Sequence, residues 1–140
     1  MSMRQELRPD ADFLEVRATG EFSLDEAKRI FVEMMEAVAL HKTKRLLFDG
    51  RTLTGNPQTL ERFYYAEFAA ATVAQFKRRD ASGVTRFAYL LKEPVLDPEK
   101  FGENVAANRG MLVQAFDNPH EALAWLGTPS ANNPGGGNGP

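Results

Sequence analysis

The chain has 140 residues, no cysteine and a formal net charge of −2 at pH 7. This length favours one domain with its own core, the lack of cysteine excludes disulfides and thiolate metal sites, and the mixed charges argue against nucleic acid as the main partner. No stretch approaches the roughly 20 apolar residues that cross a bilayer, and the polar residues 1–12 lack the apolar segment of a signal peptide, so we expect a cytoplasmic protein.

Two alternating segments near the N-terminus predict a β-hairpin. Residues 3–8 alternate weakly, and residues 13–19 alternate clearly, with apolar side chains on one side and polar side chains on the other. Residues 9–12, which read Pro-Asp-Ala-Asp, have the composition of a turn between them.

A capping box opens the first predicted helix, because the Ser23 hydroxyl can accept from the Glu26 amide while the Glu26 carboxylate reaches back. Apolar residues at helical spacing carry this helix from Leu24 to about His41. Residues 45–49 then form an apolar run without alternation, which is typical of a strand buried on both faces. A strand, a helix and a parallel strand make a right-handed crossover.

This strand is expected to stop at Asp49-Gly50, before a polar loop over residues 52–56. In α/β sheets, sites form at the carboxyl ends of such strands. The candidate switch loop consists of Asp49, Arg51, Thr52 and Thr54. Asp49 either binds a ligand cation or serves as a turn residue. The threonines either accept phosphate, which suits the N-terminus of the following helix, or bond to the backbone.

The next helix is predicted from Asn56-Pro57, a cap followed by a proline suited to the first turn, to about Arg79. Its apolar residues lie on two nearly opposite sides. The stripe expected in the core consists of Leu60, Phe63, Tyr64, Phe68, Ala71 and Ala74. The second stripe consists of Tyr65, Ala69, Val73 and Phe76. A helix that is apolar all round is either buried or in an interface. The second stripe is therefore a candidate interface, or it is covered by the tip of the sheet or by residues 92–97.

The remaining elements continue the alternation. Residues 80–83 break the chain, residues 86–91 form a strand, and Asp97 opens a third helix that stops at residues 108–110. A last strand over residues 111–116 and a fourth helix, from Asn118 to Gly127, follow. The order β-β-α-β-α-β-α-β-α predicts an α/β fold: a mostly parallel five-stranded sheet with an N-terminal hairpin, covered by about four helices.

The composition changes sharply near the C-terminus. Residues 128–140 are Asn, Gly, Pro and Ser with almost nothing apolar, which is typical of a disordered tail. We therefore expect a single domain over residues 1–127.

Several segments carry a resemblance to a known family. These segments are Leu46 to Arg51, Asp97 to Phe101, Glu103 to Gly110, Val113 to Phe116 and Glu121 to Leu126. With the element order, they make the chain similar to the STAS superfamily, specifically the group similar to stage II sporulation protein AA, the anti-anti-sigma factor. The same fold class includes the CRAL-TRIO lipid-binding domains. The resemblance implies a regulatory or protein-interaction module.

The candidate switch loop departs from the family pattern. Signalling members carry an Asp-Ser-Ser/Thr-Gly motif whose serine is phosphorylated to release a partner. Here the loop reads Arg-Thr-Leu-Thr-Gly-Asn over residues 51–56, so the acid is missing and a threonine stands where serine is usual. We therefore expect an antagonist-like module without the usual serine phosphoswitch.

Catalytic and metal-binding motifs are not recognisable in the sequence. It contains no nucleophile elbow, P-loop or dinucleotide-binding glycine pattern, and His41 and His120 have no partner at ligand spacing. We expect no enzyme, no cofactor and no metal. Basic clusters at residues 42–45 and 77–79 either complement helix C-termini or contact an anionic lipid or acidic partner.

Three functions remain open. The first is a module that binds a protein partner or itself, as a homodimer, through the second stripe. The second is a carrier or sensor of a small hydrophobic ligand or lipid, indicated by the aromatic residues of the long helix. The third is an anti-sigma antagonist controlled by phosphorylation of Thr52 or Thr54.

Overall fold

The computed structural model describes residues 3–9, 13–79 and 85–127, and its element order is the predicted one. The strands are β1 (Arg4–Pro9), β2 (Leu14–Glu21), β3 (Arg45–Thr54), β4 (Arg86–Leu90) and β5 (Leu112–Phe116). The helices are α1 (Leu24–His41), α2 (Thr59–Arg79), α3 (Phe101–Asn108) and α4 (Pro119–Leu126). The α/β fold class is confirmed. The predicted hairpin turn, the break at 80–83 and the tail at 128–140 lie outside the described residues, apart from Pro9.

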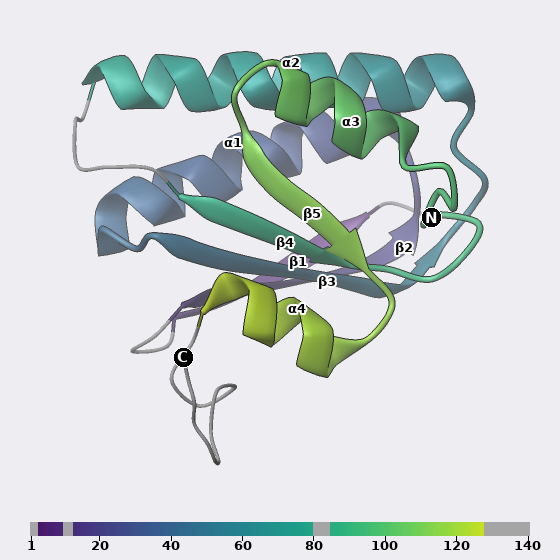
Figure 1. Ribbon diagram of the computed structural model, residues 1–140, viewed down its shortest axis with the longest axis horizontal. Coiled ribbons are helices and arrows are strands. Elements are labelled where there is room, and N and C mark those ends of the chain that lie inside the picture. Colours follow the sequence, from purple (N-terminus) through teal and green to yellow (C-terminus); the bar gives the residue numbers. More distant parts are fainter. Residues whose placement is uncertain (1–2, 10–12, 80–84, 128–140) are drawn as a thin grey trace.

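The five strands form one sheet in the order β1-β2-β3-β4-β5. β1 pairs with β2 in antiparallel fashion, and all other pairs are parallel. Each parallel strand is added on the same side of the previous one, so right-handed crossovers place their helices on one face. Accordingly α1, α2 and α3 cover one face of the sheet, while α4, which follows the last strand, lies on the other (Figure 1).

The main core lies between the sheet and α1, and α4 closes a smaller one on the opposite face. In β3, Leu46 and Phe48 belong to the main core and Leu47 to the smaller one, so this strand is buried on both faces as expected. The largest fully buried side chains of the main core are Phe31, Phe87, Leu14, Ile30, Met34, Leu46 and Val16.

α2 faces the core with the side opposite to the one predicted. In the stripe that we took as the candidate interface, Ala69 and Val73 are only 1% and 9% exposed, and Tyr65 and Phe76 pack against the core. The stripe expected in the core includes four exposed residues, Leu60, Tyr64, Ala71 and Ala74. The inner side is rich in alanine, which allows α2 to lie close to the bulky residues of α1. The predicted interface at Tyr65, Ala69, Val73 and Phe76 is therefore wrong, because these residues do not form an open surface.

β3 continues five residues beyond its predicted end. Arg17 pairs with Asp49 and Thr19 with Thr52, so β3 holds one extra residue at this point, a β-bulge. β4 stops at Leu90, opposite Asp49. The predicted polar loop is thus mostly strand, held by β2 alone.

The helix starts are partly as predicted. The Ser23 side chain accepts from the Glu26 N–H, but the Glu26 carboxylate accepts from the N–H of Met3 at 2.7 Å instead of reaching back. α2 begins at Thr59, not at Asn56-Pro57, with the Glu61 carboxylate accepting from the N–H of Gln58 at 2.8 Å. α3 begins at Phe101, because the preceding Asp-Pro-Glu-Lys segment forms a turn.

Candidate functional site

The carboxylate of the predicted switch loop is bound within its own strand. Asp49 receives two hydrogen bonds from the Arg51 guanidinium, at 3.1 and 2.9 Å, and a third from the Arg51 backbone N–H at 3.2 Å. Burial opposes ionisation of Asp49, but the bonds from Arg51 outweigh it, so the pKa of Asp49 lies below its ordinary value. This geometry favours a structural role at the bulge over cation binding.

The two candidate phosphoacceptors lie on the exposed, last part of β3. The hydroxyl of Thr52 is 3.4 Å from the carbonyl oxygen of Ala18, and that of Thr54 is 3.4 Å from the carbonyl oxygen of Gly20. Both donate to the backbone of β2, as short hydroxyl side chains commonly do. Phosphorylation of either threonine stays a prediction.

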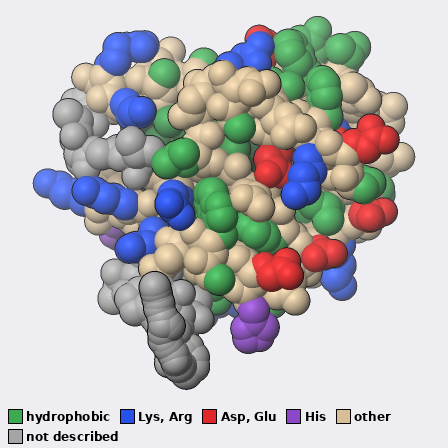
Figure 2. Space-filling view, viewed as in Figure 1, with side chains coloured by type: hydrophobic (Ala, Val, Ile, Leu, Met, Phe, Trp, Pro, Cys, Tyr) green, Lys and Arg blue, Asp and Glu red, His purple; other side chains and the backbone are tan. Residues whose placement is uncertain are grey.

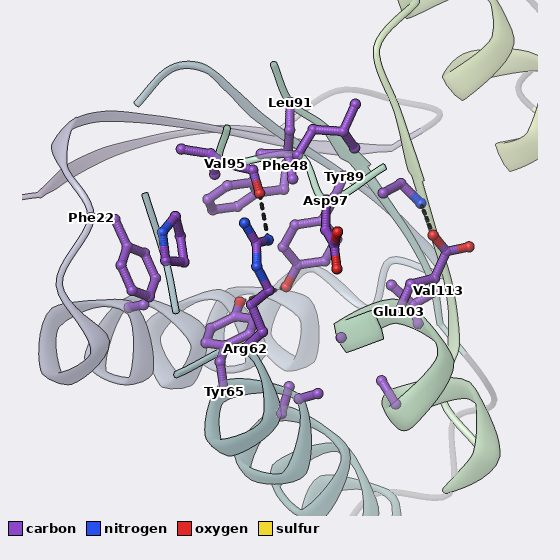
Figure 3. Close-up of a pocket in the computed structure, with 18 of the residues that line it drawn as sticks. Phe22, Phe48, Arg62, Tyr65, Tyr89, Leu91, Val95, Asp97, Glu103 and Val113 are labelled. Atoms are coloured by element: carbon purple, nitrogen blue, oxygen red, sulfur yellow. Dashed lines mark hydrogen bonds between the residues drawn. The ribbon is translucent and has the colours of Figure 1, made fainter. Parts of the chain in front are cut away.

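A cavity of about 150 Å³ lies between the helix-covered face of the sheet and α2 and α3. Its walls come from the ends of β3 and β4, from the segment that follows β4, and from the inner sides of the helices (Figure 3). Ala66 and Ala69 on α2, and Gly102 and Ala106 on α3, leave the space open because their side chains are small. The walls are almost entirely apolar, apart from a few polar groups.

Two tyrosine hydroxyls form the polar centre of this cavity. Tyr65 enters from α2 and Tyr89 from β4, and their hydroxyl oxygens are 2.6 Å apart (Figure 3). Aromatic contacts hold both rings, since Tyr65 meets Phe31 edge-on at 6.0 Å and Tyr89 lies 4.8 Å from Phe48. Burial raises the pKa of both tyrosines, so both hydroxyls keep their protons at ordinary pH.

One hydroxyl proton of this pair is left without an acceptor among the described residues. Two hydroxyls bring two protons, and the contact between them uses one. Neither tyrosine makes a second hydrogen bond to any group in the described part of the chain. The pair therefore offers one O–H donor at an apolar cavity.

The charged groups at the rim have structural roles. The Arg62 guanidinium donates to the carbonyl oxygens of Pro94 and Val95, at 2.7 and 2.8 Å, and so fixes the segment after β4. The Asp97 carboxylate accepts from the backbone N–H groups of Glu99 and Phe101 at the start of α3, and these bonds outweigh partial desolvation and lower its pKa. Glu103 accepts from the Ala115 N–H at 3.3 Å, and burial raises its pKa.

The segment over residues 92–97 and part of the second stripe of α2 line the same cavity. Val95 is buried and lines the same cavity as Tyr65 and Ala69. Ala69 belongs to the main core and Tyr65 packs against it, so both residues face the inside of the fold.

An apolar surface remains on the outside of α2 and α3. Leu60 is 64% exposed, Tyr64 47% and Phe101 37%. The Phe63 ring joins them, 5.6 Å from Tyr64 and 6.5 Å from Phe101. We call these four residues the α2–α3 patch. Hydrophobic side chains gather on this part of the surface in Figure 2.

Basic side chains gather at the opposite end of the molecule, where α1 and α2 end (Figure 2). Arg45 and Arg86 donate to the carbonyl oxygens of Leu126 and Trp125, at 3.0 and 2.6 Å, and so cap the C-terminus of α4. His41 and His120 are exposed. No cluster of three or more His, Asp or Glu side chains suited to a metal occurs in the part of the chain that the structure describes.

The chain has a SpoIIAA-like fold, as the resemblance predicts. Solved structures with this fold include an anti-sigma factor antagonist from Mycobacterium paratuberculosis, with 11% identity over 89% of this chain and 94% of that one and a TM-score of 0.55. The unphosphorylated anti-sigma factor antagonist SpoIIAA has 11% identity, a coverage of 88% and 96%, and a TM-score of 0.54. An uncharacterized protein from Shewanella loihica with a SpoIIAA-like fold has 18% identity, a coverage of 89% and 94%, and a TM-score of 0.48.

Comparison of the sequence alone adds no relative: no protein-family model and no curated protein matches it. At 11% identity, the likeness to the two antagonists establishes the fold and leaves the activity to the chemistry of this chain. Within the described residues, no helix has both the length and the apolarity to span a membrane.

Proposed function

We propose that the chain is a non-enzymatic regulatory module that works by binding a protein of the anti-sigma factor class in the cytoplasm, without a serine phosphoswitch. The exposed α2–α3 patch is the observation that carries this proposal. The chain has the fold of two anti-sigma factor antagonists. Three residues of the patch lie on α2, the helix that follows the candidate switch loop.

The chemistry of the patch suits a protein interface. Large apolar and aromatic side chains supply most of the binding energy in such interfaces, and burying one of them releases about 1.5–3 kcal/mol. The Arg109 guanidinium stacks 5.7 Å from the centre of the Phe63 ring and pairs with Glu67 at 3.2 Å, which holds one side of the patch in place. A rim of charges around an apolar centre is the usual arrangement of an interface.

Two matched leucine variants test the patch. Leu60→Asp places a charge in the patch, and Leu40→Asp does the same at another exposed leucine, 76% exposed at the end of α1. Binding to purified anti-sigma factors encoded by the same genome is measured for the wild type and both variants. We expect Leu60→Asp to weaken binding at least about tenfold, which corresponds to about 1.4 kcal/mol, and Leu40→Asp to leave it unchanged.

Both leucines are exposed, so neither variant should lower the melting temperature much. Equal binding by the two variants would remove the patch from the proposal. If none of the anti-sigma factors binds the wild type, the proposed partner class is wrong.

The threonines of the switch sequence provide a second test of the same proposal. A Thr52→Val/Thr54→Val variant retains the β-branched shape suited to a strand and removes both hydroxyls. We expect it to bind the partner as the wild type does, before and after incubation with a serine/threonine kinase and ATP. A loss of phosphate-dependent release in this variant would show that the chain does have a switch.

The cavity favours a second candidate function, a sensor or carrier of a small hydrophobic ligand. At about 150 Å³, it is smaller than the roughly 300 Å³ at which pockets for drug-sized ligands begin, so it suits a small molecule better than a lipid chain. Native mass spectrometry of the protein purified from cells tests this function. A bound mass in the range of a small aromatic compound supports it, whereas a phospholipid mass or a clean apo mass contradicts it.

A further inference from the structure

We propose that the cavity binds a small neutral aromatic molecule with one oxygen acceptor, which takes a hydrogen bond from the Tyr65–Tyr89 hydroxyl pair. This inference rests on the second candidate function and names its class of ligand. No group of the described residues uses the remaining O–H donor of the pair.

The size of the cavity sets the size of the ligand. An engineered apolar cavity of about 150 Å³ in another protein binds benzene, and the cavity here has about the same volume. The ligand is therefore a molecule of roughly six to nine non-hydrogen atoms.

The walls favour an aromatic ring. Phe48, Tyr65 and Tyr89 present ring faces and edges to the cavity (Figure 3), and aromatic rings prefer offset or edge-to-face contact with one another. Leu91 and Val95 complete an apolar wall. A ring among these side chains replaces empty space by dispersion contacts, which are weak singly and large together.

The hydroxyl pair favours a ligand with an acceptor oxygen. Both tyrosines are partly buried, so an O–H group that lacks a partner there has lost part of its hydration, which is unfavourable. Because burial raises the pKa of both tyrosines, the pair donates a proton in a hydrogen bond and does not become an anion. A carbonyl, ether or hydroxyl oxygen on the ligand satisfies this donor.

The balance of charge at the cavity disfavours an anionic ligand. Arg62 and Lys100 line it together with Asp97 and Glu103, two cations with two acids. The Arg62 guanidinium is already bound to two backbone carbonyls, and Lys100 is exposed to solvent. A carboxylate would lose its hydration without gaining a buried cation, which is unfavourable by several kcal/mol.

Three probes of similar shape separate these requirements. Acetophenone has the acceptor oxygen, α-methylstyrene replaces the carbonyl by a carbon–carbon double bond, and benzoate adds a charge. Binding of each probe to the full chain is measured by chemical-shift titration. We expect acetophenone to bind saturably in the millimolar range or below, α-methylstyrene to bind roughly three- to tenfold more weakly, and benzoate not to bind.

Two variants assign the binding to the cavity. Tyr65→Phe/Tyr89→Phe removes both hydroxyls and keeps both rings, so acetophenone should bind no better than α-methylstyrene. A single Tyr→Phe change is not sufficient, because the hydroxyl of the remaining tyrosine can still donate to the ligand. Ala106→Leu, at a buried lining position, fills the space and should abolish binding of all probes. Melting curves confirm that each variant is folded.

Each outcome decides one part of the inference. If no neutral probe binds, or if Ala106→Leu binds the probes normally, the cavity is not the site. Equal affinity for acetophenone and α-methylstyrene in the wild type overturns the role of the hydroxyl pair, and tight binding of benzoate overturns the neutral class. A clean apo mass together with probe binding contradicts the second candidate function alone, because the site then exists without a ligand acquired in cells.

Discussion

Replacing Val73 by aspartate tests the orientation of α2 more sharply than any other single change. Val73 is 9% exposed and belongs to the main core. The substitution forfeits about 1.5–2 kcal/mol of apolar burial. It also places a carboxylate where it cannot keep its hydration. The carboxylate can escape that penalty by taking up a proton, which at pH 7 costs about 4 kcal/mol, since its ordinary pKa is about 3.9. The sum is about 5–6 kcal/mol.

This loss is comparable with the whole stability of many domains, about 5–15 kcal/mol. Urea unfolding followed by tryptophan fluorescence measures it, because the chain has a single tryptophan. Trp125 lies on α4, on the opposite face of the sheet from α2, so it reports unfolding of the whole domain. The matched control is Ala74→Asp, at an exposed position one residue further along α2. It should lower stability by about 0.5–1 kcal/mol, mainly through helix propensity.

The pH dependence of the stability difference between Val73→Asp and Ala74→Asp shows whether burial of the new carboxylate causes the loss. Burial raises the pKa of an aspartate above its unfolded value, so its contribution is most favourable below about pH 4 and is lost as pH rises. The deficit of Val73→Asp relative to Ala74→Asp should therefore shrink between pH 7 and pH 4. Suppose instead that Val73→Asp is as stable as the control and changes the oligomeric state. Val73 would then lie on an interface, and the inward orientation of this stripe would be wrong.

Three further predictions concern other parts of the fold. Gly50→Val should destabilise the protein by about 1–3 kcal/mol, seen as a lower melting temperature, because even a Cβ atom at Gly50 would lie within 2.8–2.9 Å of three neighbouring side chains; a neutral effect would mean that the bulge has more room than this. Arg86→Ala should loosen α4, with a loss of about 1–2 kcal/mol, since Arg86 both donates to the Trp125 carbonyl and stacks on its ring at 5.2 Å; an unchanged tryptophan emission and stability would contradict it. Glu103→Gln keeps an acceptor for the Ala115 N–H and removes the titration. Because burial raises the pKa of Glu103, the wild type loses stability as pH rises through that value, so the melting temperature of the variant relative to the wild type should increase from pH 4 to pH 7, and a constant difference would count against this reasoning.

The sequence was sufficient for the order of elements because local signals mark most of their limits. Ser23 and Asn118 cap their helices as predicted, with the Asn118 side chain accepting from the N–H of Glu121 at 3.1 Å. The apolar run after Lys44 is a strand buried on both faces. The end of that strand was not predictable, because Asp-Gly is typical of a turn. Its continuation depends on β2, which is long enough to keep pairing after the bulge.

The orientation of α2 could not be read from hydrophobicity either. Leu60 and Tyr64 are exposed, whereas Ala66, Ala69 and Ala70 are buried. A helix packed closely against other helices needs small residues at the contact, and bulky neighbours fill the space. Here Phe31 and Met34 of α1 are fully buried, and the Phe31 ring meets Tyr65 of α2 at 6.0 Å. A residue scale that ranks aromatic side chains above alanine therefore selects the wrong face.

The cavity also results from small residues on the inner sides of α2 and α3. Ala66 and Ala69 are spaced i, i+3 on α2, and Gly102 and Ala106 are spaced i, i+4 on α3, so each pair lies on one side of its helix. The sequence shows these spacings, but not that the two small sides face each other across Tyr65 and the end of β4. A cavity is a property of the packing between elements, and no single segment carries it. The large apolar residues that would have filled this space stand on the outside of the same helices, where they form the α2–α3 patch. One arrangement of side chains on α2 and α3 thus produces both candidate sites, an apolar cavity and an exposed apolar surface.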